Sequence, residues 1–154
     1  DLLRAFAKLD RADARLFIFG DGPEGDPLRA MAGAFGIASR VRFLGHRDDI
    51  ADLFPGLDVF VLPSLAEGLP RVLLEAQACG VPVVATRVGS VADAVCPASG
   101  RLVAPADPAA LAAAITASLD TAPPVSPRAF VEQRYDWQRT LAAYRRITGG
   151  ADVG

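Results

Sequence analysis

The sequence predicts a doubly wound α/β domain, a Rossmann-like and mostly parallel sheet with helices on both faces. Short apolar runs rich in β-branched and aromatic residues recur along the chain, and each has the length of a buried strand. Segments with apolar residues at helical spacing separate these runs, and glycine or proline marks most boundaries. Because strands that alternate with helices form right-handed parallel crossovers, a sheet of about five strands is expected.

Length and composition indicate one globular domain. The chain has 154 residues, of which 51% are hydrophobic, and a net charge of −2. The hydrophobic fraction excludes a disordered chain, and the lack of a basic patch argues against a nucleic-acid partner. No apolar run approaches the roughly 18–20 residues of a membrane span. Cys79 and Cys96 fit a reducing compartment better than a disulfide framework.

The expected elements follow from these boundaries. Strands are expected at 15–19, 41–45, 58–62, 82–85 and 100–105. Helices are expected at 1–9, 27–35, 48–54, 70–78, the end of 87–95, and 108–119, the last capped by Asp107. A proline-rich linker at 121–127 leads to an amphipathic stretch whose apolar side is Tyr135, Trp137, Leu141, Tyr144 and Ile147. The domain is expected to span 1–148, with a disordered tail at 149–154.

The most informative stretch runs over residues 63–86. Pro63 ends a strand, and Pro70 suits the first turn of a helix, where a missing N–H costs nothing. Gly80 occupies the place of a helix C-terminal glycine. The helix at 72–78 is apolar nearly all round, so it is expected to be mostly buried.

Two glutamates give this stretch its chemistry. Glu67 lies in the loop at the carboxyl end of a strand, where open α/β sheets bind ligands. Glu75 lies on the apolar helix and is expected to be a buried carboxylate, which needs hydrogen-bond donors. Gly68 and Leu69 lie at the helix N-terminus, where N–H groups and the helix dipole favour an anion such as phosphate. Carboxylates accept hydrogen bonds from hydroxyl groups, and N–H groups donate to phosphate oxygens. The two kinds of group side by side suit a sugar nucleotide.

A purely structural interpretation of the same residues stays open. Glu67 would then be a solvated loop residue. Glu75 follows Arg71 by four positions on a helix, so the two would form a plain surface ion pair.

The string EGLPRVLLEAQACGVPVVAT, with Glu67 and Glu75 as an E-x7-E pair, closely resembles the donor-site signature of retaining GT-B glycosyltransferases (glycosyl transferase group 1, family 4). The resemblance covers the chain from Asp1 to about Ile147 and implies the C-terminal, donor-binding half of the GT-B fold. It implies that Glu67 is the catalytic residue touching the transferred sugar, that the amides of Gly68 and Leu69 hold the donor diphosphate, and that Glu75 bonds the nucleotide ribose.

The same resemblance implies weaker assignments in two further loops. Gly45, His46 and Arg47 would lie near the nucleotide base, and Gly20 and Gly22 would edge the donor cleft, although a plain tight turn is an equal alternative. His46, the single histidine, has no carboxylate or nucleophile partner that the sequence can supply, which favours an ordinary loop position. The family usually has two glycines and then Pro-Glu after the next strand, where this chain has Gly-Ser and Ala-Asp.

The implied partners are a nucleotide-diphospho-sugar donor and an N-terminal acceptor domain of the same protein that is missing here. No metal and no cofactor are implied, because no plausible loop holds an Asp-x-Asp cluster. A cytoplasmic location is implied, compatible with peripheral membrane association through the missing domain. The helix at 1–9 has the pattern of one whose preceding strand has been cut away, and Lys8 is the single lysine. The family's phosphate-binding Arg and Lys are therefore expected to be missing, and the chain alone to be inactive.

Three alternatives stay open. A nonhydrolysing sugar-nucleotide epimerase shares the two-domain architecture, although the acid/base residues it needs are not found here. A NAD-type dinucleotide-binding domain rests on the G-x-G-x-x-G string at 20–25. Asp21, Glu24 and Asp26 argue against it, because they would crowd three carboxylates around a pyrophosphate. A non-catalytic interaction module is the third.

Overall fold

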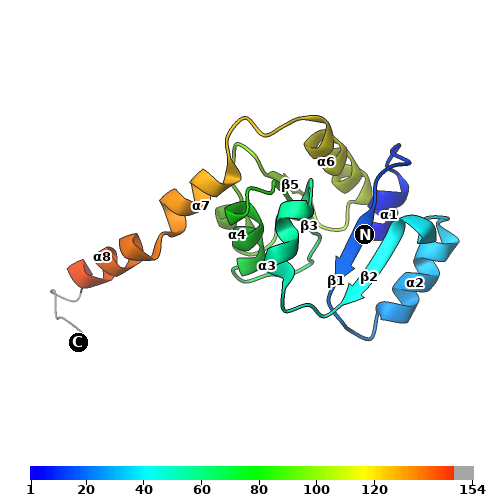
Figure 1. Cartoon of the computed structure of the whole chain (residues 1–154), viewed down its shortest axis with the longest axis horizontal. Helices are drawn as coiled ribbons and strands as arrows, with labels where there is room; N and C mark the ends of the chain where they lie inside the picture. The colour runs from blue at the N-terminus through cyan, green and yellow to red at the C-terminus, as the bar shows by residue number, and fades with distance from the viewer. Residues whose placement is uncertain (148–154) are drawn as a thin grey trace.

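Strands and helices alternate along the chain, as the sequence predicts (Figure 1). The computed structural model describes residues 1–147, apart from the side chains at 139–140, 143–144 and 147, so the predicted tail at 149–154 lies outside the described residues. The strands are β1 (Leu16–Phe19), β2 (Val41–Gly45), β3 (Phe60–Leu62), β4 (Val83–Thr86) and β5 (Arg101–Val103). The helices are α1 (Leu2–Ala7), α2 (Gly25–Ala34), α3 (Ile50–Leu53), α4 (Arg71–Ala78), α5 (Val91–Ala94), α6 (Pro108–Asp120), α7 (Pro127–Tyr135) and α8 (Trp137–Ile147), with 3₁₀ turns η1 (Ala38–Arg40) and η2 (Phe54–Gly56).

The strands form two parallel sheets. β1 pairs with β2, and β3, β4 and β5 form a second sheet with β4 in the centre. The doubly wound α/β class is confirmed. The expectation of one sheet is wrong, because among the described residues no strand joins β1 to β3.

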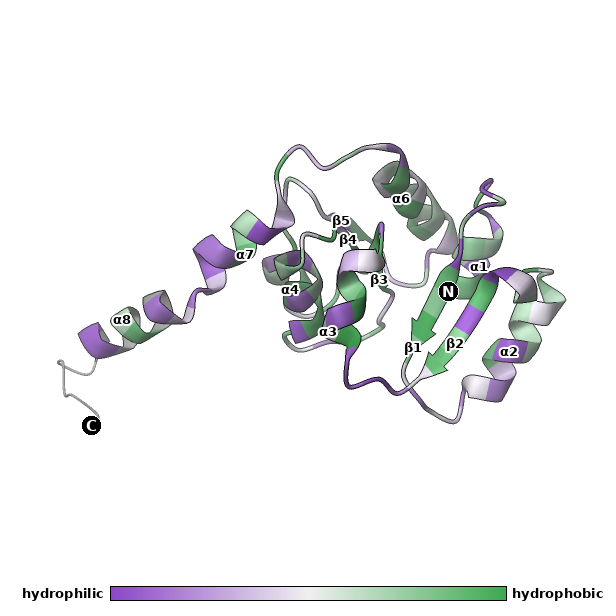
Figure 2. Cartoon of the chain, in the orientation of Figure 1, coloured by the Kyte–Doolittle hydropathy of each residue, from purple (hydrophilic) through white to green (hydrophobic). Residues whose placement is uncertain are grey.

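The strands of the larger sheet divide their side chains between two cores. Val84 of β4 packs with residues of α1, α2 and α6, whereas its neighbours Val83 and Ala85 pack with α4 and α5. Helices therefore cover both faces of this sheet. On β1 and β2, which Figure 2 shows as largely hydrophobic, the alternate side chains Phe17 and Leu44 stay 43% and 37% exposed.

Predicted capping signals end α4 and begin α6. Gly80 has φ 84°, a left-handed conformation that glycine adopts without a steric penalty. The N–H of Gly80 donates to the Gln77 carbonyl (2.9 Å), and the N–H of Val81 donates to the Ala76 carbonyl (3.0 Å). These two bonds form a Schellman motif. At α6, the Asp107 side chain accepts two backbone N–H groups at 3.0 and 2.9 Å, which confirms the predicted cap.

The buried polar side chain of α4 is Gln77, not Glu75. Gln77 is 0% exposed, whereas Glu75 is exposed, so the expectation of a buried carboxylate is wrong. Gln77 Nε2 donates to the carbonyls of Leu73 (2.8 Å) and Ala94 (2.7 Å), and its Oε1 accepts from the Cys96 N–H (2.7 Å). Gln77 thus ties α4 to the end of α5 and to the residues just after it.

The C-terminal helices behave differently from each other. α7 packs against α4, and the Tyr135 hydroxyl donates to the Asp93 carbonyl at 2.7 Å. α8 leads away from the body of the domain (Figure 1), and Trp137 at its start is 64% exposed. α7 is therefore docked on this domain, whereas the side chains of Tyr144 and Ile147, on the predicted apolar side of α8, lie outside the described ones. None of the described helices combines the length and apolarity needed to cross a membrane.

We predict that Gln77→Leu destabilises the domain by about 2–4 kcal/mol, because the Ala94 carbonyl and the Cys96 N–H would lose their partner while buried. Thermal unfolding should shift downward by about 5–15 °C. Gln138→Leu makes the same chemical change at an exposed position and should stay within about 0.5 kcal/mol of the parent. Equal unfolding temperatures for both variants would contradict this role of Gln77.

Candidate functional site

The loop between β3 and α4 is fixed by hydroxyl groups at the carboxyl end of the sheet. Thr86 Oγ1, at the end of β4, donates to the Ser64 carbonyl. Ser64 Oγ in turn donates to Glu67 Oε1 at 2.6 Å. Glu67 is half-buried, so its carboxylate is oriented by the loop itself. Sequence analysis missed both hydroxyls, because hydrogen bonds of loop side chains have no pattern along the chain.

A glycine in the loop after β4 packs directly on the backbone of Glu67. Gly89 has φ 50°, and a Cβ on it would lie 1.9 Å from the Glu67 carbonyl oxygen. The next residue, Ser90, donates its N–H to the Gly68 carbonyl at 3.3 Å. Only a residue without a side chain allows this approach, so Gly89 sets the position of the Glu67–Gly68 backbone. Sequence analysis assigned no role to Gly89.

The start of α4 presents free backbone donors. Within the described residues, the N–H groups of Gly68, Leu69, Arg71 and Val72 donate to no protein acceptor, and Pro70, the N-cap, has no N–H. Gly68 and Leu69 are exposed. Because the positive end of the helix dipole lies here as well, this helix start favours an anionic group.

Glu75 lies one turn into α4, on the same face as Arg71. Its side chain makes no hydrogen bond or ion pair with any described residue, so the structure does not show the alternative Arg71–Glu75 ion pair. Along the chain, Glu67 precedes the free N–H groups and Glu75 follows them. One carboxylate is held in place and the other is free to accept hydrogen bonds.

The two glycine-containing loops after β1 and β2 lie side by side. The Gly20 N–H donates to the Gly45 carbonyl at 2.8 Å, and a Cβ on Gly45 would meet Asp21 Oδ1 at 3.1 Å. The G-x-G-x-x-G string does connect a strand to a helix, because α2 begins at its third glycine. Asp21 and Glu24 in the string, and Asp26 just after it, are all exposed around that helix start, and a Cβ on Gly22 would have nothing within 4 Å.

The loop after β2 carries two exposed side-chain contacts, of which Arg47–Asp49 is an ion pair. His46 Nε2 lies 3.0 Å from Asp48 Oδ1, so the expectation that His46 lacks a carboxylate partner is wrong. Arg47 Nε donates to Asp49 Oδ1 at 2.7 Å, and this hydrogen bond lowers the pKa of Asp49. Within the described residues, no hydrogen bond or ion pair links this loop to Glu67 or Glu75.

Metal and thiol chemistry have little support in the described part of the chain. No three His, Cys, Asp or Glu side chains within residues 1–147 are placed to hold a metal ion. Cys79 is exposed, Cys96 is buried, and both are free thiols. The expectation that no metal or cofactor takes part stays a prediction.

The fold and site define an α/β domain that presents free helix N–H groups after the carboxyl end of a parallel strand, and along the chain these groups lie between two glutamates. The family model for "Glycosyl transferases group 1" matches residues 1–121. The chain therefore belongs to this family of glycosyltransferases, and its solved structural neighbours place its fold in one half of the GT-B architecture.

Similar proteins come from several bacteria. D-inositol 3-phosphate glycosyltransferase of Mycobacterium marinum is 38% identical over 172 aligned positions, covering 99% of this chain and 36% of the relative. N-acetyl-alpha-D-glucosaminyl L-malate synthase of Bacillus anthracis is 42% identical over 96 residues, 62% of this chain and 25% of the relative. The structure of Anabaena HepE in complex with UDP is 27% identical with a TM-score of 0.78, covering 92% of this chain and 44% of that one. The chain thus spans less than half of each.

We predict that Gly89→Ala displaces the Glu67–Gly68 backbone, because the new methyl group would overlap the Glu67 carbonyl oxygen. The left-handed backbone alone costs an alanine about 1–2 kcal/mol. Thermal unfolding should report this loss, and the amide resonances of Gly68 and Leu69 should shift.

Gly33→Ala is the matched control, since Gly33 lies inside α2 with nothing within 4 Å of an added Cβ. Alanine there should be neutral or stabilising by about 0.5–1 kcal/mol. If the Gly68 and Leu69 resonances stay unchanged in Gly89→Ala, the positioning role assigned to Gly89 is wrong.

Proposed function

We propose that this domain binds the nucleotide-diphospho-sugar donor of a retaining glycosyltransferase. The observation that carries this proposal is the group of free N–H donors at the start of α4, between the fixed carboxylate of Glu67 and the free carboxylate of Glu75. A sugar nucleotide has a diphosphate flanked by hydroxyl groups on both sides, and this arrangement complements it.

Each part of the site takes one part of the donor. The amides of Gly68 and Leu69, together with the helix dipole, take the diphosphate and stabilise the charge that develops on it as the leaving group. Glu67, oriented by Ser64, accepts hydroxyl hydrogen bonds from the transferred sugar. Glu75 accepts hydrogen bonds from the ribose hydroxyls. No metal or cofactor is needed for these contacts.

The loops after β1 and β2 complete the donor cleft in this proposal. Gly20 and Gly22 edge the cleft, and Gly45, His46 and Arg47 lie toward the base. The exposed carboxylates of the 20–25 loop make it a poor pyrophosphate cradle, which favours a glycosyl donor over a NAD-type dinucleotide.

The comparisons support a nucleotide-sugar ligand. HepE was solved with UDP and with UDP-glucose. A Corynebacterium glutamicum relative, 34% identical over 142 residues, is a GDP-mannose-dependent mannosyltransferase. This proposal includes transfer with retention and a separate acceptor domain. It also includes a cytoplasmic site of action, with peripheral membrane contact through that domain.

We predict that Glu75→Ala weakens nucleotide binding by about 10–100-fold, because hydrogen bonds to a charged group contribute about 1.5–3 kcal/mol. A thermal-shift screen with UDP, GDP and ADP would identify the nucleotide, and calorimetry would give the affinities. Asp10→Ala is the control, since Asp10 is exposed in the loop before β1, at the other end of the strands. Equal affinities for the two variants would refute the ribose assignment.

We predict that residues 1–154 alone bind the nucleotide weakly and transfer no sugar, because the acceptor half of the site is not part of them. A radiolabelled UDP-glucose or GDP-mannose assay, with water or an added sugar as acceptor, would measure this. Turnover that disappears in Glu67→Gln but persists in Asp10→Ala would show that these residues suffice for catalysis, contrary to this prediction.

A further inference from the structure

A small cavity lies at the amino edge of the larger sheet, at the opposite end of the strands from the candidate site. Its volume is about 130 Å³, and it is lined by Pro82, just before β4, and by Arg101, the first residue of β5. Because β4 and β5 are parallel, both residues lie where the strands begin. Thr86, at the other end of β4, is about 13 Å further along the strand. We call this space the amino-edge cavity.

The walls of the amino-edge cavity are built from residues with little freedom to move. Part of the wall is formed by prolines, which have a fixed φ and no N–H group: Pro82, Pro97, Pro123 and Pro124. The last two belong to the linker between α6 and α7, so this linker closes part of the cavity. Gly100 leaves no space for a side chain, since a Cβ on it would lie 2.3 Å from Val95 Cγ1.

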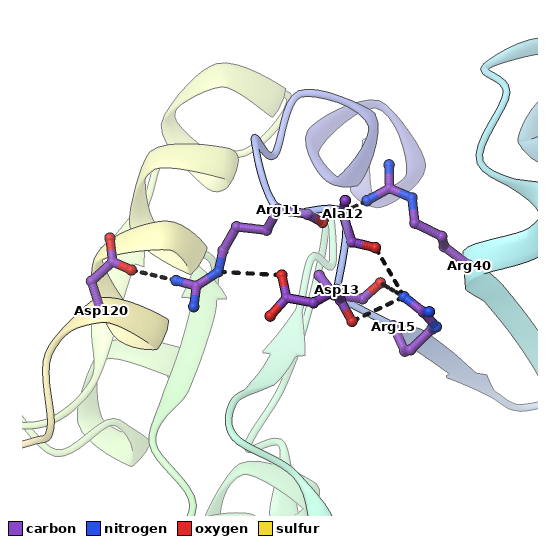
Figure 3. Close-up of polar contacts among 7 residues, drawn as sticks. Arg11, Ala12, Asp13, Arg15, Arg40 and Asp120 are labelled. Atoms are coloured by element: carbon purple, nitrogen blue, oxygen red, sulfur yellow. Dashed lines mark hydrogen bonds and ion pairs between the residues drawn. The ribbon is translucent and has the colours of Figure 1, made fainter.

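Arg101 is the one charged residue among the described residues that line the cavity. Its Nε donates to Ser118 Oγ at 3.1 Å, and its Nη2 donates to the Ala117 carbonyl at 3.3 Å. These two bonds orient the guanidinium and leave further N–H groups to donate, since arginine has five. Asp120, the one acidic residue of α6, pairs with Arg11 instead (Figure 3). No carboxylate in the described part of the chain forms an ion pair with Arg101.

A buried hydroxyl group in the same wall also lacks a partner. Ser99 lines the cavity and is 9% exposed, and its Oγ has no hydrogen-bond partner among the described residues. Because a buried hydroxyl without a hydrogen bond costs free energy, this group is suited to a ligand that accepts one. The N–H of Ala98 likewise donates to no described acceptor, and Thr121 brings a second hydroxyl to the lining.

We propose that the amino-edge cavity binds a small oxyanion of the phosphate class, either as the free ion or as the phosphate group of a monoester. Arg101 supplies the positive charge, and the hydroxyls of Ser99 and Thr121 donate to the anion oxygens. Phosphate oxygens accept hydrogen bonds from several directions, which suits donors on separate segments of the chain. A pocket for a drug-sized ligand has about 300 Å³ or more, so this cavity holds a phosphate group but no nucleotide. The proposal does not depend on the donor assignment.

The test uses this chain and inorganic phosphate. Phosphate and chloride are added in parallel at matched ionic strength, because exposed charges respond to salt alone. Amide resonances report where phosphate binds, and thermal unfolding reports how much it stabilises the domain. The resonances of residues 98–101 are read separately from those of Gly68 and Leu69, because the free N–H groups of α4 offer phosphate a second site. Glycerol phosphate, added in the same way, distinguishes a monoester from the free ion.

Phosphate should shift the resonances of residues 98–101, and Arg101→Gln should weaken this binding by about tenfold or more, because a charged donor is lost. Arg42→Gln removes an exposed arginine from β2 and should leave the affinity unchanged. Ser99→Ala separates binding from folding. Without phosphate, this variant should unfold at the temperature of the parent or higher, because alanine buries no unpartnered hydroxyl. With phosphate, it should gain less stability than the parent.

Resonances at 98–101 that do not respond to phosphate, or that respond equally to chloride, would overturn the proposal. Equal phosphate affinities for the parent and Arg101→Gln would overturn it as well. Arg101 would then serve only as a cap for the end of α6, and a water molecule would satisfy Ser99. Shifts confined to Gly68 and Leu69 would reject this site while leaving the donor assignment intact.

Discussion

The close approach of Gly89 to the Glu67 carbonyl is the constraint on which the candidate site depends. It lets the loop after β4 lie against the loop after β3, where Ser90 and Thr86 add hydrogen bonds to Gly68 and Ser64. The end of β4 and the loop that follows it thereby fix the short loop between β3 and α4. The carboxylate of Glu67 and the free N–H groups of α4 keep a defined relation because this backbone cannot move toward Gly89.

α4 shows how much of the site the sequence predicts and where the prediction fails. The helix, its glycine end and the placing of Glu67 in the preceding loop all follow from local signals, and the structure confirms them. The prediction that Glu75 is buried was wrong, because an apolar run does not show which of its two polar positions faces the core. Gln77 faces it, and its amide is satisfied by Leu73 one turn earlier and by two partners distant in sequence, Ala94 and Cys96. Contacts with distant partners, like the contact of Gly89 with Glu67, depend on tertiary packing and leave no local pattern in the sequence.

The sheet shows the same division. All five strand positions are predicted by apolar runs, because composition reflects burial. The split into two sheets could not be predicted, since a strand's composition does not name its neighbours. β3 has the apolar character of a central strand, yet each of its three residues is only half-buried, whereas β4 is fully buried. Its sequence therefore suits more burial than the described residues provide.

A second, longer cavity and the candidate site meet at the carboxyl edge of the sheets. This cavity has a volume of about 1180 Å³ and is lined by all residues of β1 and β3. Pro63 lines the cavity just after β3 and immediately precedes Ser64, which holds Glu67, and Phe19 lines the cavity just before Gly20. In open α/β sheets ligands bind at this edge, beside the point where the strand order reverses.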